Sequence, residues 1–172
     1  MALLPIRLYG DPILRQTARP VEEVDEDLRA LAQDMGETMR AHDGVGLAAN
    51  QVGELRRILV VDFQPITGED HIEAFINPEI VEEEGRMRLE EGCLSIPDVQ
   101  EEIERSHRVR VRYLDREGYE QEQEGEGFLA AVLQHEIDHL NGVLIVDHIS
   151  ALRRSMIKST LKHIARRASA EA

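Results

Sequence analysis

Hydrophobic residues recur along the chain with the two periods that distinguish helices from strands. Between residues 25 and 42, large apolar side chains recur at helical spacing, namely Leu28, Leu31, Met35 and Met39. The first turn of this segment is acidic and Gly44 lies just past its end, and both features are typical of helix boundaries. The pattern therefore predicts a helix that buries one face.

The middle of the chain is predicted to form strands. A continuous apolar centre in residues 57–63 predicts a buried strand, and residues 72–76 predict another, which we expect Asn77-Pro78 to end. Alternation of Val and Tyr with Arg in residues 108–113 predicts a half-buried strand. Two hairpins are also expected: residues 80–83 with 87–90, turning at Gly85, and residues 118–126 with 108–113.

A second helix is predicted from about Gly127 to Leu140, where Asn141-Gly142 ends it. Its apolar stripe consists of Leu129, Leu133, Ile137 and Leu140. Strands thus follow a first helix and precede a second, which predicts an α+β fold of mainly antiparallel sheets packed around this central helix. Residues 149–172 predict a C-terminal amphipathic helix, with apolar positions at Leu152, Met156, Ile157, Leu161, Ile164 and Ala168.

The composition is typical of a soluble globular protein, with 42% hydrophobic and 31% charged residues. The length of 172 residues fits a single domain over residues 1–172, around which residues 5–20, with three prolines, are expected to wrap as an extended segment. The net charge of −14 argues against DNA binding. The absence of a long apolar run, of a leader-like N-terminus and of a second Cys predicts a cytoplasmic location and no membrane contact.

The segment from Leu133 to Leu140 carries the strongest chemical signal. It contains His-Glu-x-x-His, in which His135 and His139 lie four residues apart. On a helix both imidazoles project from one face, so they can bind one metal ion. Glu136 lies about a third of a turn from His135, where its carboxylate can reach a water beside the metal without being a ligand.

A catalytic metal site needs a third protein ligand and one open position. One class of zinc peptidase has a His where this chain has Ile145, and His148 comes three residues too late. Another class uses a Glu on a later helix, where this chain offers only Glu171. Cys93, about forty residues upstream in a predicted loop, is therefore the best candidate, and one Cys with two His suits Zn²⁺ or Fe²⁺.

Residues 44–51 form a third unusual segment, Gly-Val-Gly-Leu-Ala-Ala-Asn-Gln. Its small side chains leave room for another backbone or a ligand, and Gln51 is its only long polar residue. A plain loop between helix and strand is the alternative interpretation.

Together, residues 44–51, residues 91–95 (Glu-Gly-Cys-Leu-Ser) and residues 134–140 (Gln-His-Glu-Ile-Asp-His-Leu) resemble the three signature motifs of peptide deformylases, in the same order and at similar separations. The flanks at residues 9–15 and 111–115 are also similar, so the resemblance covers about residues 5–150. It implies a bacterial-type enzyme that removes the formyl group from N-formylmethionyl nascent peptides and releases formate.

The resemblance also implies roles for individual residues. Cys93, His135 and His139 match the ligands of one divalent metal ion, Fe²⁺ in the cell, with Zn²⁺, Ni²⁺ or Co²⁺ as replacements. Glu136 matches the general base and acid, while the Gln51 amide and the Leu94 backbone N–H match the donors to the oxyanion. Substrate contacts are expected at Val45, Gly46 and Gly92, and a methionine pocket at Phe128, Ala131 and Val132. Periodicity alone places the last three equally well in the core.

Two other functions stay open from the residues alone. A zinc peptidase is disfavoured because a third ligand is missing at both usual peptidase positions. An inactive metal-binding scaffold is disfavoured because it would need neither Glu136 nor Gln51.

The C-terminal segment is basic although the chain is acidic. Residues 149–172 hold six Lys or Arg against Glu171 alone, and four of the six form an i, i+4 stripe: Arg154, Lys158, Lys162 and Arg166. One interpretation is a solvated face that offsets the charge of the body. The other, suggested by the resemblance, is docking of this helix on ribosomal RNA.

Overall fold

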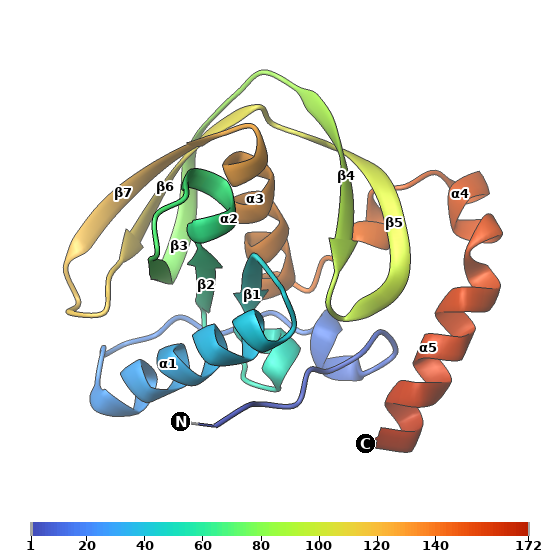
Figure 1. Cartoon of the computed structure of the whole chain (residues 1–172), viewed down its shortest axis with the longest axis horizontal. Helices are drawn as coiled ribbons and strands as arrows, with labels where there is room; N and C mark the ends of the chain where they lie inside the picture. The colour runs from blue at the N-terminus through green and yellow to red at the C-terminus, as the bar shows by residue number, and fades with distance from the viewer. Residues whose placement is uncertain (1, 172) are drawn as a thin grey trace.

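The computed structural model describes residues 2–171. Figure 1 shows helix α3 (Phe128–Leu140) in the centre, between two sheets. The order in the larger sheet is β1-β2-β3-β6-β7, and β4 and β5 form the smaller sheet, with every pairing antiparallel. The predicted α+β fold around a central helix is therefore confirmed. The strands are β1 (Gly46–Ala48), β2 (Ile58–Asp62), β3 (Ile72–Glu84), β4 (Met87–Cys93), β5 (Ile96–Arg105), β6 (Arg108–Leu114) and β7 (Glu120–Glu126).

The larger sheet is covered on both faces, which explains the continuous apolar run of β2. Leu59 and Val61 pack with the α3 stripe on one face. Ile58 and Val60 pack on the other face with the stripe of α1 (Glu26–Ala41), and all four β2 residues are fully buried. Both predicted helices thus bury the faces that their periodicity indicates. The short helix α2 (Gln64–Thr67) follows β2, and one-turn helices occur at η1 (Pro12–Arg15), η2 (Ala49–Val52) and η3 (Ile145–Asp147).

The expected strand end at Asn77-Pro78 is wrong, because β3 continues to Glu84. A register shift between Ile76 and Glu79 absorbs the proline, which has no N–H to give to the ladder. Asn77 has a φ of +51° and its side chain exchanges two hydrogen bonds of 2.8 Å with the backbone of Val21. These bonds hold the irregular backbone in place within the strand.

The expected hairpin at Gly85 is also wrong. Residues 80–84 pair with β6 and residues 87–93 with β5, so the chain passes at Gly85 from one sheet to the other. Strand β5 is absent from the sequence prediction because its second half is rich in charge. Its burial nevertheless alternates, with Val99, Glu101, Ile103 and Arg105 facing inward. The pairing of residues 118–126 with residues 108–113 is confirmed by β6 and β7.

The N-terminal segment is extended except at η1, as predicted. Its backbone N–H groups donate to carbonyls of three distant segments: Arg7 to Gln51 at 2.7 Å, Tyr9 to Ser95 at 2.8 Å and Ala18 to Leu140 at 2.8 Å. These three carbonyls belong to, or adjoin, the three motif segments of the sequence. The wrapping segment therefore ties the three motifs together.

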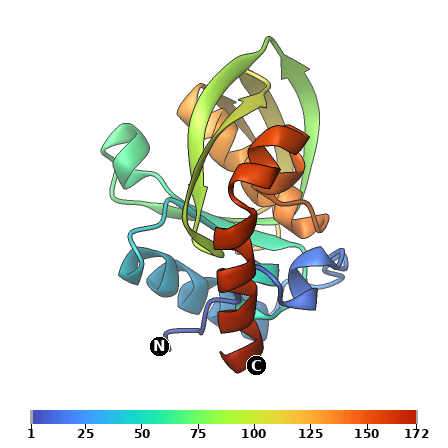
Figure 2. The same ribbon diagram turned by 90° about the vertical axis from the view of Figure 1, so that its right-hand side faces the viewer.

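The predicted single C-terminal helix is two helices, α4 (Ala151–Met156) and α5 (Lys158–Glu171), separated at Ile157. Figure 2 shows α5 alongside the smaller sheet. Its Leu161, Ile164 and Ala168 join the apolar residues of β5 in one buried cluster. Two apolar positions of the predicted stripe, Leu152 and Met156 on α4, are 72% and 63% exposed instead. Among residues 2–171, no helix has the length and apolar character that a membrane crossing requires.

Candidate active site

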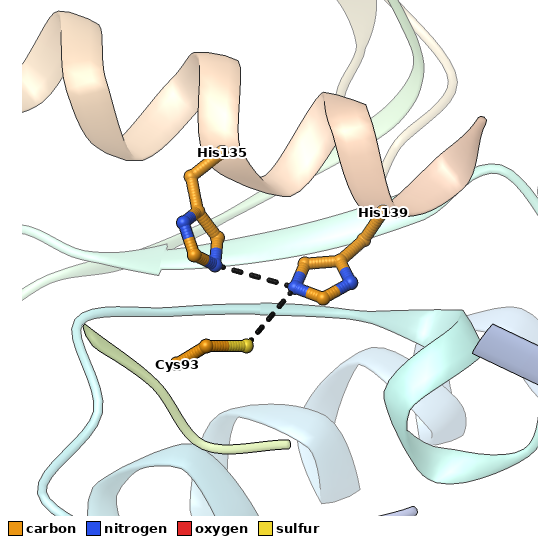
Figure 3. Close-up of side chains that lie close together, drawn as sticks. All are labelled: Cys93, His135 and His139. Carbon is orange, nitrogen blue, oxygen red and sulfur yellow. Dashed lines mark hydrogen bonds between the residues drawn. The ribbon is translucent and has the colours of Figure 1, made fainter. Parts of the chain in front are cut away.

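The three side chains predicted as metal ligands, two on α3 and one at the end of β4, meet on one side of the central helix. His135 and His139 lie one turn apart on α3, with their Nε2 atoms 3.2 Å from each other. Cys93, the last residue of β4, places its Sγ 3.3 Å from His139 Nε2 (Figure 3). One donor atom from each side chain lies within 4.8 Å of the other two. The three predicted ligands therefore converge.

This donor set fits a divalent metal ion. One sulfur and two imidazole nitrogens from two separate elements form a typical Zn²⁺ or Fe²⁺ set. His139 is 1% exposed, and burial together with His135 lowers its pKa, which favours the neutral form that binds metal. Burial opposes protonation of His135, but the neighbouring Glu136, Cys93 and Glu91 raise its pKa. Metal binding therefore requires His135 to give up a proton, whereas the surroundings of His139 already favour its neutral form.

Sequence reasoning missed the carboxylate behind His135. Glu91 Oε1 lies 3.0 Å from His135 Nδ1, which directs the other ring nitrogen, Nε2, toward Cys93 and His139. Arg105 donates to both oxygens of Glu91, at 2.8 and 2.9 Å, and its third bond goes to Asp138 at 2.8 Å. Burial alone would raise the pKa of Glu91, but the bonds from Arg105 and His135 lower it to about 2. The available sequence signal was the position of Glu91 two residues before Cys93, within the matched segment of residues 91–95.

Glu136 is aimed into the site and incompletely bonded. It is 4% exposed, and its Oε1 has no hydrogen-bond partner among the described residues. Burial raises its pKa to about 7, so the group can both accept and return a proton near neutral pH. Gly46 of β1 leaves room for the Glu136 carboxylate, because a Cβ at residue 46 would lie 2.7 Å from Glu136 Oε2.

The Gln51 side chain is oriented by its own loop. The Ala48 N–H donates to Gln51 Oε1 at 3.0 Å, which leaves the Nε2 donor on the side of the ligands. Nε2 donates to Ser95 Oγ at 3.1 Å and lies 3.7 Å from Cys93 Sγ. Gln51 is 1% exposed. Residues 44–51 are therefore part of the site and not only a loop between helix and strand.

A cleft of about 430 Å³ opens beside these groups. It is lined by Glu136, Gln51, Leu94 and two of the three predicted metal ligands, Cys93 and His135. All six residues that the sequence places beside the substrate also line it: Val45, Gly46, Gly92, Phe128, Ala131 and Val132. Val132 belongs to the core cluster as well, and Phe128 is 49% exposed at the opening.

The sequence of this chain is similar to sequences of known proteins over most of its length. The family model described as polypeptide deformylase matches residues 3–155. The chain belongs to the peptide deformylase family. A peptide deformylase of Mesorhizobium japonicum is 54% identical over 169 residues, covering 96% of this chain and 95% of that protein. One of Alkalilimnicola ehrlichii is 50% identical over 166 residues, covering 96% and 93%.

Solved peptide deformylases share the fold. The crystal structure from Legionella pneumophila has a TM-score of 0.89 at 43% identity and covers 98% of both chains. The Ehrlichia chaffeensis structure in complex with actinonin has a TM-score of 0.89 at 39% identity and covers 97% of this chain and 98% of that one. The resemblance inferred from the motifs is thus confirmed. These matches do not favour the two alternative functions, a zinc peptidase and an inactive metal-binding scaffold.

Peptide deformylases are metalloenzymes, and this member has a side-chain cluster that suits a metal ion. Within residues 2–171, Cys93, His135 and His139 are the one such cluster with metal-ligand geometry. The peptidase-type position at residue 145 holds an apolar side chain, and the nearby His148 is paired elsewhere. Ile145 is 2% exposed in an apolar cluster, and His148 Nε2 lies 2.8 Å from Asp138 Oδ2.

Proposed function

We propose that the protein is a metal-dependent hydrolase that removes the formyl group from N-formylmethionyl peptides and releases formate. One observation carries the proposal. Three side chains that suit a metal ion converge beside a cleft that Glu136 lines, and Glu136 has a buried oxygen with no partner in the described structure. Family membership supplies the formyl-methionyl substrate class.

In this proposal Cys93, His135 and His139 hold the metal and leave one position open. A bound divalent ion supplies Lewis acidity, to the attacking water and to the formyl oxygen. We propose Fe²⁺ as the ion in the cell, with Zn²⁺, Ni²⁺ or Co²⁺ as replacements, because a donor set of one thiolate and two imidazoles accepts all four. Glu91 fixes the orientation of the His135 ring.

Glu136 acts as the base and then the acid. Its carboxylate takes a proton from the water that attacks the formyl carbon, and later gives that proton to the nitrogen of the departing methionyl amine. A pKa of about 7 suits both transfers. The C–N bond of the formamide breaks, so formate and a peptide with a free amino group are the products.

Gln51 and Leu94 are proposed to stabilise the negative charge that develops on the formyl oxygen. The Gln51 Nε2 donor already faces this side of the site, and Leu94 lines the cleft. We place the substrate backbone along Val45, Gly46 and Gly92. Its methionine side chain lies against Phe128, Ala131 and Val132.

Formate release from a formyl-methionyl dipeptide, compared with cleavage of casein, tests the proposed activity. We expect formate from the dipeptide and intact casein. Casein fragments without formate would make the protein a peptidase. Neither product from metal-loaded protein would favour the inactive scaffold.

We also propose that α5 docks on ribosomal RNA, which would bring the enzyme to nascent peptides in the cytoplasm. Lys158, Lys162 and Arg166 are exposed at i, i+4 spacing, and none has an ion pair with the described side chains of residues 2–170. Phosphate contacts by these cations would weaken steeply with salt. The remaining member of the stripe, Arg154, donates to the Val146 carbonyl at 2.7 and 3.2 Å and is therefore excluded from the test.

The docking test replaces Lys158, Lys162 and Arg166 by Glu, and the matched control keeps their charge with Lys158→Arg, Lys162→Arg and Arg166→Lys. Co-sedimentation with ribosomes at low salt should be lost in the first variant and kept in the second. Equal co-sedimentation of both variants would leave α5 as a structural cover of β5.

A further inference from the structure

A second cavity lies beside the network that supports His135. Its volume is about 410 Å³, and it shares no lining residue with the active-site cleft. Arg105, Asp138 and His148 line this second cavity, whereas Glu91, the partner of Arg105, lines the cleft. The ion pair of Arg105 with Glu91 therefore extends from the wall of one cavity to the wall of the other.

A chain of short contacts runs from the second cavity to a predicted metal ligand. His148 Nε2 lies 2.8 Å from Asp138 Oδ2, and the same oxygen accepts from Arg105 Nη1 at 2.8 Å. Arg105 donates to both oxygens of Glu91, and Glu91 Oε1 lies 3.0 Å from His135 Nδ1. Because a carboxylate only accepts, His148 is the donor to Asp138. His148 is thus the outer end of a continuous chain of contacts to His135.

Arg105 joins the two elements that carry the predicted ligands. Asp138 belongs to α3, where it directly precedes His139. Glu91 belongs to β4, two residues before Cys93. Through these two carboxylates the buried guanidinium ties the helix to the strand. This link therefore helps to set the distance between the Cys93 thiol and the imidazoles of α3.

The Asp138 end of the link is the more exposed one. The Asp138 side chain is 26% exposed, against 9% for Glu91. Among residues 2–171, its carboxylate bonds only to Arg105 and His148. His148 directly follows η3, which contributes two buried apolar residues, so its ring is presented from a fixed backbone. The bond from His148 therefore keeps the Asp138 carboxylate directed at Arg105.

We propose that His148 is a positioning residue for metal binding, which acts through Asp138 on the link between α3 and β4. This inference rests on the metal ligands of the proposed function. Loss of the direct partner of a ligating His typically lowers metal affinity by about 10- to 100-fold. His148 reaches His135 only through Asp138, Arg105 and Glu91, so we expect a smaller effect, about two- to tenfold.

The test loads the protein with Co²⁺ and measures two quantities. Chelator competition gives the metal affinity, and the visible absorption spectrum of the bound Co²⁺ reports the geometry of its ligands. We expect His148→Ala to bind Co²⁺ about two- to tenfold more weakly than the wild type and to change the spectrum. His148→Gln should keep both wild-type values, because its side-chain amide can donate to Asp138 in place of the imidazole.

Two results would overturn the positioning role. One is wild-type affinity and spectrum in His148→Ala, and the other is an equal loss of affinity in His148→Ala and His148→Gln. Wild-type protein that binds no Co²⁺ would overturn the proposed function instead.

The route through Asp138 is tested by a double-mutant cycle. In an Asp138→Ala background, His148→Ala should change the affinity by less than about twofold, because its acceptor is already absent. The full loss in this background would overturn the proposed route.

The matched control is His71→Ala. His71 is also partly exposed and lies 3.2 Å from the carboxylate of Glu73, but it lines neither cavity. The control should keep the wild-type affinity and spectrum. A loss equal to that of His148→Ala would assign the effect to surface contacts between His and carboxylates in general, and would overturn the proposal.

Discussion

Glu91 supports a sharp test of how the metal ligands are held. Its carboxylate accepts two bonds from Arg105 and lies within bonding distance of His135, and the side chains of Glu91 and Arg105 are 9% and 4% exposed. In Glu91→Gln, the buried guanidinium keeps only Asp138 as a charged partner. Removing one partner of a buried ion pair costs about 3–5 kcal/mol. Because Asp138 remains, we expect a loss of about 3 kcal/mol in the free energy of unfolding.

The same change should weaken metal binding, because the charged carboxylate that accepts from His135 is replaced by a weaker, uncharged amide oxygen. Loss of such a partner typically lowers metal affinity by about 10- to 100-fold. Urea unfolding of the metal-free forms measures the first effect, and chelator competition measures the second. Glu90→Gln, one residue earlier and exposed, is the matched control and should change neither quantity.

The loss of unfolding free energy in Glu91→Gln should become smaller as the pH falls. The folded-state pKa of Glu91 is about 2, below its ordinary value of 4.5. The stability that the ionised carboxylate contributes is therefore complete above pH 4.5 and is lost as the pH falls from 4.5 toward 2. The difference in the free energy of unfolding between wild type and Glu91→Gln should therefore decrease over that pH range. A variant with wild-type stability and metal affinity at neutral pH would refute this account of the network.

Three further results are expected. Gln51→Ala should lower kcat by about 10²- to 10³-fold in steady-state formate assays, because an oxyanion donor acts in the transition state; a change confined to KM would make Gln51 a binding residue only. Gly46→Ala should fold but lose most turnover, since its Cβ would displace Glu136, and a crystal structure with Glu136 unmoved would contradict this. The Fe²⁺ form should lose activity in air much faster than the Ni²⁺ or Zn²⁺ form, because the Cys93 thiolate on iron is open to oxidation; equal decay of all forms would contradict this.

Local sequence patterns predicted much of this site because its key groups are fixed by short spacings. His135, Glu136 and His139 are set by one helical turn. Cys93 follows from the need for a third ligand. Neither spacing nor composition shows which segments lie next to α3, but the structure brings both Cys93 and Gln51 there.

The network behind His135 was not predictable in the same way. Glu91 and Arg105 lie on the same buried face of the β4–β5 pair but four positions apart in its register, and β5 has too many charges to be recognised as a strand. Periodicity also failed where one residue redirects the chain. The hydrogen bonds of Asn77 with Val21 keep β3 continuous, and Val21 is distant in the sequence. At Gly85 the chain passes from one sheet to the other, and the strands that pair on either side of it are also distant in the sequence.

The central claim is that Cys93, His135 and His139 hold a metal ion, and that Glu136 transfers the proton of the attacking water without being a ligand. The most direct measurement combines metal content with formate release for Glu136→Ala, beside the wild type and Cys93→Ser. We predict that Glu136→Ala keeps its metal and loses turnover, whereas Cys93→Ser loses most of its metal. Full turnover in Glu136→Ala, or loss of its metal together with its activity, would contradict the account.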